Sequence, residues 1–128
     1  MDQEDKILVI DDSQAIRYMM AEVFRSLSHQ IIEAENGQVG LQRLEGPDKI
    51  CLIFLDVHMP VMDGLTFLEK LQDERYKWAH SIPVIMLTTE DKKECIITAK
   101  KRGAKGWLIK PTKHETIIKV YQKFVLKV

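Results

Sequence analysis

Three carboxylates and one lysine follow directly after apolar runs of the sequence. Asp11 and Asp12 follow KILVI, Asp56 follows ICLIFL, and Lys110 follows GWLI. If these runs are strands of one parallel sheet, their carboxyl ends share an edge of that sheet, and the four side chains converge there. Three carboxylates held together repel one another, so one would take up a proton unless a cation neutralised them. A magnesium ion suits this position, because it takes oxygen ligands and leaves coordination positions for water and phosphate oxygens.

Asp56 carries a carboxylate, a group that can act as a nucleophile toward phosphorus. A carboxylate can form an aspartyl-phosphate intermediate when neighbouring charges neutralise the incoming phosphate. Magnesium and Lys110 would stabilise the charge on the equatorial phosphoryl oxygens, which is the main task in phosphoryl transfer. The apolar run before Asp56 would fix the carboxylate, and the turn-forming segment VHMPVMDG after it would leave it accessible. The alternative is that these aspartates only cap separate helices.

Apolar runs and helical patterns alternate along the chain, with no repeat or linker between them. The apolar runs predict five strands, at residues 6–12, 30–34, 50–56, 83–88 and 106–110. The spacing of apolar residues predicts five helices, around residues 16–27, 39–44, 65–71, 92–102 and 114–128. This alternation indicates an α/β fold, with a doubly wound five-stranded parallel sheet that has helices on both faces.

Several local signals refine these boundaries. Ser13 and Asp63 are predicted to cap the helices that follow them. Asn36 and Gly37 are predicted to form a turn, and the polar segment 73–81 is predicted to be a loop. The last helix is expected to direct five side chains into the core, namely Ile117, Ile118, Tyr121, Phe124 and Val125.

The composition fits one globular domain, residues 1–128. The chain is 45% hydrophobic and 30% charged, and it is long enough to bury a core without disulfides. No apolar stretch approaches the roughly 18 residues of a membrane span, and the acidic N-terminus differs from a signal peptide. We therefore expect a cytoplasmic protein without membrane insertion, in which Cys51 and Cys95 are free thiols.

The charges are distributed unevenly, although the formal net charge is zero. Residues 1–89 contain 15 acidic and 8 basic residues, whereas residues 90–128 contain 4 acidic and 11 basic residues. This distribution fits an acidic site with a separate basic docking surface, or a lysine-rich helix that is only solvated. No helix-turn-helix or aromatic platform accompanies the basic region, so we expect no nucleic-acid partner.

The residues after the first predicted strand argue against three other kinds of site at such a sheet edge. A dinucleotide site needs a glycine-rich turn there, whereas IDDSQA carries two negative charges. Flavodoxins bind the flavin phosphate through a hydroxyl-rich first loop, which this sequence lacks. Phosphatases of the haloacid dehalogenase type carry an Asp-x-Asp pattern, whereas Asp11 and Asp12 are adjacent.

Five ordered motifs resemble the receiver domains of two-component signalling, particularly single-domain chemotaxis regulators of the CheY type. The motifs are VIDDS, LDVHMPVMDG, PVIMLTTE, KKECII and GAKGWLIKP, and together they extend over essentially all 128 residues. The resemblance implies a flavodoxin-like sheet with strand order 2-1-3-4-5. It also implies a signalling switch rather than a metabolic enzyme, with its own aspartyl phosphorylation and dephosphorylation as its only reactions.

The resemblance implies a role for each polar residue at the sheet edge. Asp56 is similar to the phosphoacceptor, which also contacts the metal. Asp11 and Asp12 are similar to the acidic pair that holds Mg²⁺, and Lys110 to the lysine that contacts the phosphoryl group. Lys110 precedes Pro111 in a pair that resembles the cis peptide of the family.

Further residues match the family less directly. Thr88 resembles the switch hydroxyl, and Trp107 occupies the aromatic position that moves with it. The backbone carbonyl of His58 matches a metal ligand, whereas its side chain is expected to be an exposed loop side chain. Thr89 stands where the family often has a smaller residue, so access to the phosphoryl site is expected to be narrower. The other histidines, His29, His80 and His114, lack metal-ligand spacing.

The resemblance implies a stand-alone phosphorylation switch, with chemotaxis as one process that it would serve. A histidine kinase or a histidine phosphotransfer protein would donate the phosphoryl group. A downstream protein would dock on the helix at 92–102, the strand at 106–110 and the helix at 114–128. The chain ends with its last predicted helix, so we expect docking rather than an attached output domain. Two alternatives stay open: a phosphotransfer relay intermediate, and the receiver portion of a hybrid histidine kinase.

Overall fold

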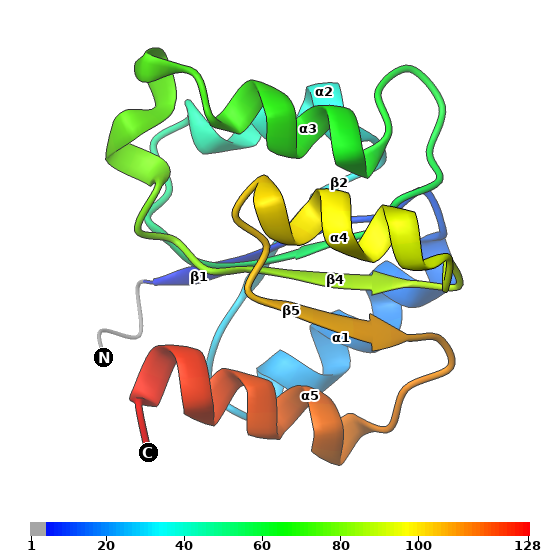
Figure 1. Ribbon diagram of the computed structural model, residues 1–128. Coiled ribbons are helices and arrows are strands. Elements are labelled where there is room, and N and C mark those ends of the chain that lie inside the picture. The colour runs from blue at the N-terminus through cyan, green and yellow to red at the C-terminus, as the bar shows by residue number, and fades with distance from the viewer. Residues whose placement is uncertain (1–4) are drawn as a thin grey trace.

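The computed structural model describes residues 5–128 and has a five-stranded parallel sheet at its centre (Figure 1). The strands are β1 (Lys6–Ile10), β2 (Ile31–Ala34), β3 (Ile50–Leu55), β4 (Val84–Thr88) and β5 (Gly106–Ile109). Their order is β2-β1-β3-β4-β5, and every pairing is parallel. The predicted α/β fold, with its doubly wound sheet and strand order 2-1-3-4-5, is confirmed.

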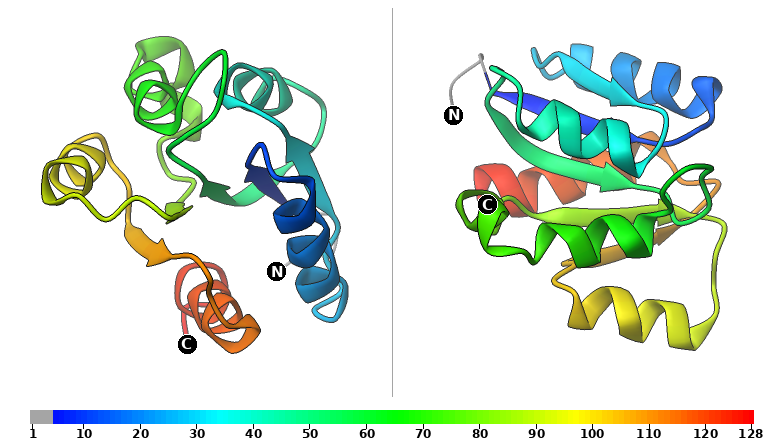
Figure 2. Two further views of the ribbon diagram at one scale, coloured as in Figure 1. Left: turned by 90° about the vertical axis from the view of Figure 1, so that its right-hand side faces the viewer. Right: turned by 90° about the horizontal axis from the view of Figure 1, so that it is seen from above.

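Helices cover both faces of this sheet (Figure 2). They are α1 (Gln14–Arg25), α2 (Gly37–Leu44), α3 (Gly64–Leu71), α4 (Lys93–Lys101) and α5 (His114–Tyr121). One core, which includes Phe24, Phe54 and Tyr121, lies under α1 and α5. The other core, which includes Phe67 and Ala99, lies under α2, α3 and α4. Within residues 5–128, no helix is long and apolar enough to cross a membrane.

The predicted caps fix how the chain enters α1 and α3. Ser13 Oγ accepts a hydrogen bond from the Ile16 N–H at 3.2 Å, and Asp63 Oδ1 accepts one from the Thr66 N–H at 2.8 Å. Each bond satisfies a backbone donor that the first helical turn leaves free. The helices therefore begin soon after the aspartates at the strand ends.

Two local predictions were wrong, and a third was confirmed only in part. Asn36 and Gly37 do not form a separate turn: Asn36 caps α2, which begins at Gly37, and its side chain accepts from the Val39 N–H. Segment 73–81 contains a 3₁₀ helix, η1 (Glu74–Ala79), because buried Tyr76 and Ala79 anchor it to the core. The last helix is regular only to Tyr121 and continues as a π-helical segment, η2 (Gln122–Leu126). Of the side chains expected inside, Ile117, Tyr121 and Val125 are buried, while Ile118 and Phe124 pack against the core partly buried.

The two central strands hold the aspartates in place. Leu8, Ile10 and Leu55 have no exposed surface, and burial of each such side chain contributes about 1.5–3 kcal/mol. The sheet hydrogen bonds extend past the strand ends, because the Asp11 N–H donates to Ala34 O at 2.9 Å and the Asp56 N–H donates to Ile10 O at 2.9 Å. The backbone of both aspartates is thus fixed by the sheet.

Gly64 brings the start of α3 against the end of β3. Its N–H donates to Val57 O at 2.8 Å. A Cβ at this position would overlap the backbone oxygen of Asp56 and would lie 3.0 Å from its carbonyl carbon. Only glycine allows this approach, and it sets the position of the loop that carries Asp56.

Val61 adopts an unusual conformation in the same loop. Its φ is +69°, which is unfavourable for a β-branched residue, and its surface is 78% exposed. Because the side chain is exposed, its burial does little to offset the cost of this backbone conformation. The segment between Asp56 and Gly64 therefore contains a strained residue.

We expect Gly64→Ala to lower the free energy of unfolding by about 1–3 kcal/mol, since the added methyl group must displace backbone rather than a side chain. Urea denaturation measures this change. Gly46→Ala is the matched control, because the nearest atom to its added Cβ is Arg43 O at 3.3 Å. Equal losses in the two variants would contradict the role given to Gly64.

We expect Val61→Asn to raise the free energy of unfolding by about 1 kcal/mol, because asparagine tolerates positive φ better than valine. Val61→Thr, which keeps the β-branch, should give no gain. Thermal unfolding of the three proteins compares them directly. If threonine stabilises as much as asparagine, the backbone of Val61 is not the source of the effect.

Candidate functional site

The carboxyl ends of β1 and β3 bring three carboxylates together. One oxygen atom from each of Asp11, Asp12 and Asp56 lies within 4.8 Å of the other two. Asp11 and Asp56 are buried and Asp12 is exposed, so the group is open to solvent on the side of Asp12. The predicted convergence of these side chains is confirmed.

Lys110 joins this group from the end of β5. Its Nζ lies 2.7 Å from Asp11 Oδ2 and 3.2 Å from Asp56 Oδ2. Burial works to lower the pKa of Lys110, but the contacts with Asp11 and Asp56 outweigh it, and the pKa lies above its usual value. Lys110 is therefore charged at neutral pH. The peptide bond from Lys110 to Pro111 is cis, as the resemblance implies.

Backbone donors orient one oxygen of each buried carboxylate. Asp56 Oδ1 accepts from the Val57 N–H at 2.8 Å, and Asp11 Oδ1 accepts from the Ser13 N–H at 2.9 Å. These bonds leave Oδ2 of both residues directed toward Lys110. Asp56 therefore presents one oxygen atom in a fixed direction.

Asp11 lacks full compensation for its burial. Although Oδ2 lies 2.7 Å from Lys110 Nζ, it makes no hydrogen bond of good geometry. Burial raises the pKa of Asp11 above its usual value, even though Lys110 and the Ser13 N–H lower it. One lysine faces three carboxylates, so two negative charges remain in excess. This set of oxygen donors fits a hard divalent cation such as Mg²⁺.

The structure places Thr88 and Trp107 on the neighbouring strands β4 and β5. Thr88 ends β4 and is fully buried, and its Oγ1 accepts from the Glu90 N–H at 3.1 Å. Trp107 lies on β5, is half-buried, and donates from Nε1 to Glu90 O at 3.0 Å. Thr89, the next residue after Thr88, is exposed. Thr88 and Trp107 thus share a hydrogen-bonding partner.

That partner, Glu90, was missed by the sequence reasoning. Its carboxylate is 8% exposed and lies 2.7 Å from the ring of His58, measured from Oε1 to Nε2. Hydrogen bonds from the Lys92 N–H and then from His58 hold the pKa of Glu90 below its usual value. The His58 side chain is 67% exposed, as expected for the loop, but it has this specific partner. An acid two residues after Thr88 was the only signal in the sequence.

The remaining histidines lie outside the carboxylate group. His29 is buried between Asp5 O and the Tyr121 hydroxyl, at 2.8 Å and 2.6 Å. His80 Nε2 lies 2.7 Å from Leu71 O. Among residues 5–128, Asp11, Asp12 and Asp56 form the one cluster with metal-ligand geometry. Cys51 and Cys95 are free thiols, as predicted.

Known proteins resemble this chain in sequence and in fold. A model of the response regulator receiver domain matches residues 7–122. Protein PilH of Pseudomonas aeruginosa is 34% identical over 116 residues, which cover 89% of this chain and 92% of PilH. The structure of chemotaxis protein CheY4 of Vibrio cholerae has a TM-score of 0.82 and 34% identity, and covers 94% of this chain and 98% of CheY4.

A third relative was solved with a ligand and a partner. The structure is described as the CheX-CheY-BeF3-Mg²⁺ complex of Borrelia burgdorferi, and its matching chain has a TM-score of 0.82 and 26% identity. The match covers 94% of this chain and 90% of that one. Together with the family match over most of the sequence, these similarities establish that the chain belongs to the response regulator receiver domain family.

Proposed function

We propose that residues 1–128 act as one cytoplasmic receiver domain, a signalling switch that is phosphorylated on Asp56 with Mg²⁺ present. The phosphoryl group would come from a histidine kinase or a histidine phosphotransfer protein. The main support is the position of Lys110, which lies between the Oδ2 atoms of Asp11 and Asp56. A lysine in this place compensates negative charge at the atom where a phosphoryl group would be attached.

Asp56 would attack the phosphorus atom of the donor phosphohistidine through Oδ2. The new P–O bond forms as the P–N bond to the donor imidazole breaks, and the imidazole leaves with the bonding electrons. The Val57 N–H keeps Oδ1 in place during this step. Lys110 would exchange its contact with Asp56 for a phosphoryl oxygen and keep its contact with Asp11.

The acidic group would hold the metal through Asp11, Asp12 and Asp56, with the backbone carbonyl of His58 as a further ligand. The metal would supply positive charge that neutralises the phosphoryl oxygens. The donor set supports this assignment, because three carboxylates with oxygen atoms within 4.8 Å of one another face one lysine. The CheY of Borrelia burgdorferi was solved with BeF3 and Mg²⁺, which supports the same chemistry here.

Output would follow from Thr88 and Trp107. A phosphoryl group on Asp56 offers the Thr88 hydroxyl an acceptor, and a shift of Thr88 would alter the packing of Trp107. Ligands shift such equilibria by binding the two conformations with different affinity. Autophosphorylation and dephosphorylation at Asp56 would be the only reactions that the domain catalyses.

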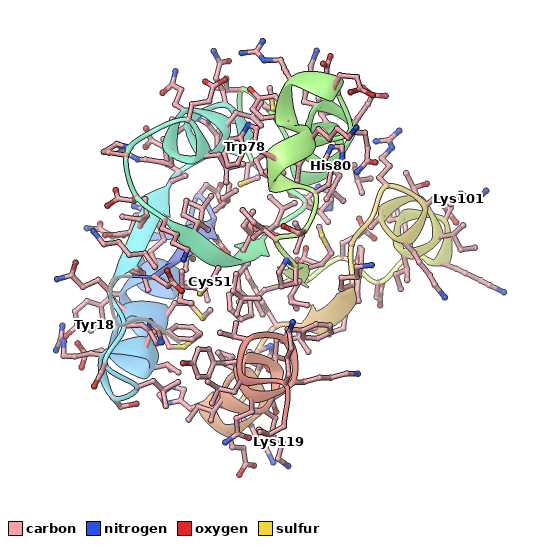
Figure 3. The ribbon with its side chains drawn as sticks, turned by 90° about the vertical axis from the view of Figure 1, so that its left-hand side faces the viewer. Tyr18, Cys51, Trp78, His80, Lys101 and Lys119 are labelled. Carbon is pink, nitrogen blue, oxygen red and sulfur yellow. The ribbon has the colours of Figure 1, made fainter. Side chains whose placement is uncertain are left out.

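The docking surface would include α4, β5 and α5. A cavity of about 210 Å³ lies between α4 and β5, with walls formed by Ile96, Ala99, Lys100, Ala104, Lys105, Gly106 and Trp107. Figure 3 shows Lys101 on α4 and Lys119 on α5 directed outward on either side of β5. Apolar walls with basic neighbours suit an acidic protein segment that carries apolar side chains.

We expect acetyl phosphate to phosphorylate Asp56 alone, and only when Mg²⁺ is present. Borohydride trapping followed by mass spectrometry identifies the modified residue, and EDTA removes the metal. Asp56→Asn should abolish the modification, since an amide is not nucleophilic toward phosphorus. Label retained in Asp56→Asn would contradict the assignment. Rapid onward transfer of the label to a histidine-containing domain would favour a relay over a switch.

We expect the combined substitutions Lys93→Glu, Lys100→Glu and Lys101→Glu to weaken binding of the downstream protein at least about tenfold, because they reverse the charge of the docking surface. Phosphorylation of Asp56 should stay intact. Binding to phosphorylated protein, measured at low and high salt, tests both the charge and the site. The control is a triple variant with the same change in net charge, in which glutamate replaces Lys70, Lys77 and Lys127. Equal losses in both triple variants would show that net charge alone acts.

A further inference from the structure

Glu90 places a charged side chain in the loop between β4 and α4, and that side chain is almost fully buried. Its Oε1 lies 2.7 Å from His58 Nε2, and its Oε2 accepts a hydrogen bond from the Lys92 N–H at 2.9 Å. Together, the two contacts connect the loop that follows Asp56 to the residues that begin α4. We refer to the contact between Glu90 and His58 as the Glu90 bridge.

The backbone of Glu90 contacts Thr88 and Trp107, the two residues of the proposed switch. Its N–H donates to Thr88 Oγ1 at 3.1 Å, and its carbonyl accepts from Trp107 Nε1 at 3.0 Å. Glu90 therefore contacts four segments at once: the loop after β3, the end of β4, the start of α4, and β5. Neither Thr88 nor Trp107 can move far unless Glu90 moves or a hydrogen bond breaks.

We propose that Glu90 is a positioning residue whose bridge to His58 holds Thr88 and Trp107 in the conformation described here. This inference rests on the proposed function, because it assumes that Thr88 moves when Asp56 is phosphorylated. A shift of Thr88 Oγ1 toward Asp56 lengthens the bond from the Glu90 N–H, and a buried N–H without an acceptor is unfavourable. Glu90 must then follow Thr88, and its movement strains the contact with His58 and changes the acceptor of Trp107.

The bridge therefore favours one of two conformations. An interaction present in one conformation and lost in the other shifts the equilibrium toward the first. Breaking it should increase the share of the switched conformation before any phosphoryl group is bound. By thermodynamic linkage, the same change must strengthen the binding of a phosphoryl mimic. These two effects distinguish the proposed role from a contribution to stability alone.

Two single substitutions break the contact with His58 from opposite ends. Glu90→Asp shortens the side chain by one methylene group, yet an aspartate can still accept from the N–H two residues later, as in an Asx turn. It should therefore keep the bond to Lys92 and lose His58. His58→Ala removes the imidazole and leaves the backbone carbonyl of residue 58 in the chain. Glu45→Asp is the control, because it shortens a carboxylate that pairs with Arg75 at 2.8 Å on another part of the surface.

The test measures Trp107 fluorescence in a Trp78→Phe background during titration with beryllofluoride at saturating magnesium. In Glu90→Asp and in His58→Ala, the emission before titration should lie closer to the saturated value of the parent protein. The apparent affinity for beryllofluoride should rise at least about fivefold. The double variant should match the single variants, because both remove one contact. Glu45→Asp should match the parent, and urea denaturation should show that all variants remain folded.

The outcomes separate this inference from the proposed function. If the parent protein responds to beryllofluoride and both single variants give the same response as the parent, the bridge does not position the switch. Additive effects in the double variant would likewise overturn the inference, since the two residues would then act independently. If the parent does not bind beryllofluoride with magnesium at all, the proposed function fails and this inference fails with it.

Discussion

Repulsion among Asp11, Asp12 and Asp56 is the constraint on which the site depends. Two like charges about 4 Å apart repel by about 4 kcal/mol at the effective dielectric constant near a protein surface. Oxygen atoms of the three carboxylates lie within 4.8 Å of one another, so the folded state must offset the repulsion energy of several such pairs. Buried side chains on β1 and β3 supply more than this, at about 1.5–3 kcal/mol each. Lys110 compensates part of the charge, and the remaining negative charge is what the proposed cation would neutralise.

Different parts of the molecule position the site and respond to it. The aspartates lie directly after strands whose hydrogen bonds continue into them, and Gly64 locks the next helix against Asp56. Glu90, in contrast, lies in a loop and holds its neighbours through four hydrogen bonds. Hydrogen bonds of this kind contribute modestly to net stability, so they can be exchanged where a packed strand cannot. A rigid site beside an adaptable loop suits a protein that must change conformation without losing its fold.

The uneven distribution of charge along the sequence becomes a spatial separation in the fold. The acidic side chains that gather at the carboxyl edge follow β1 and β3, near the centre of the sheet. The exposed lysines of α4 and α5 lie beside β5, the edge strand (Figure 3). Under the proposed function, a cation and an acidic protein segment would therefore be attracted to different places. This separation would allow one small domain to carry both a phosphoryl site and a docking surface.

The fold and the convergence of most candidate site residues were predictable from the amino-acid sequence, whereas the connections between these residues depend on tertiary contacts. Apolar runs of strand length, each followed by a polar residue, were enough to predict that Asp11, Asp56 and Lys110 converge, because parallel strands end at one edge. Local patterns could not reveal Glu90, since its partner His58 is 32 residues away and an isolated acid in a loop has no periodic signal. They also missed η1, in which tertiary burial of Tyr76 and Ala79 adds to the local cap formed by Asp73. Contacts between distant segments depend on how the helices pack, and only the folded chain specifies that packing.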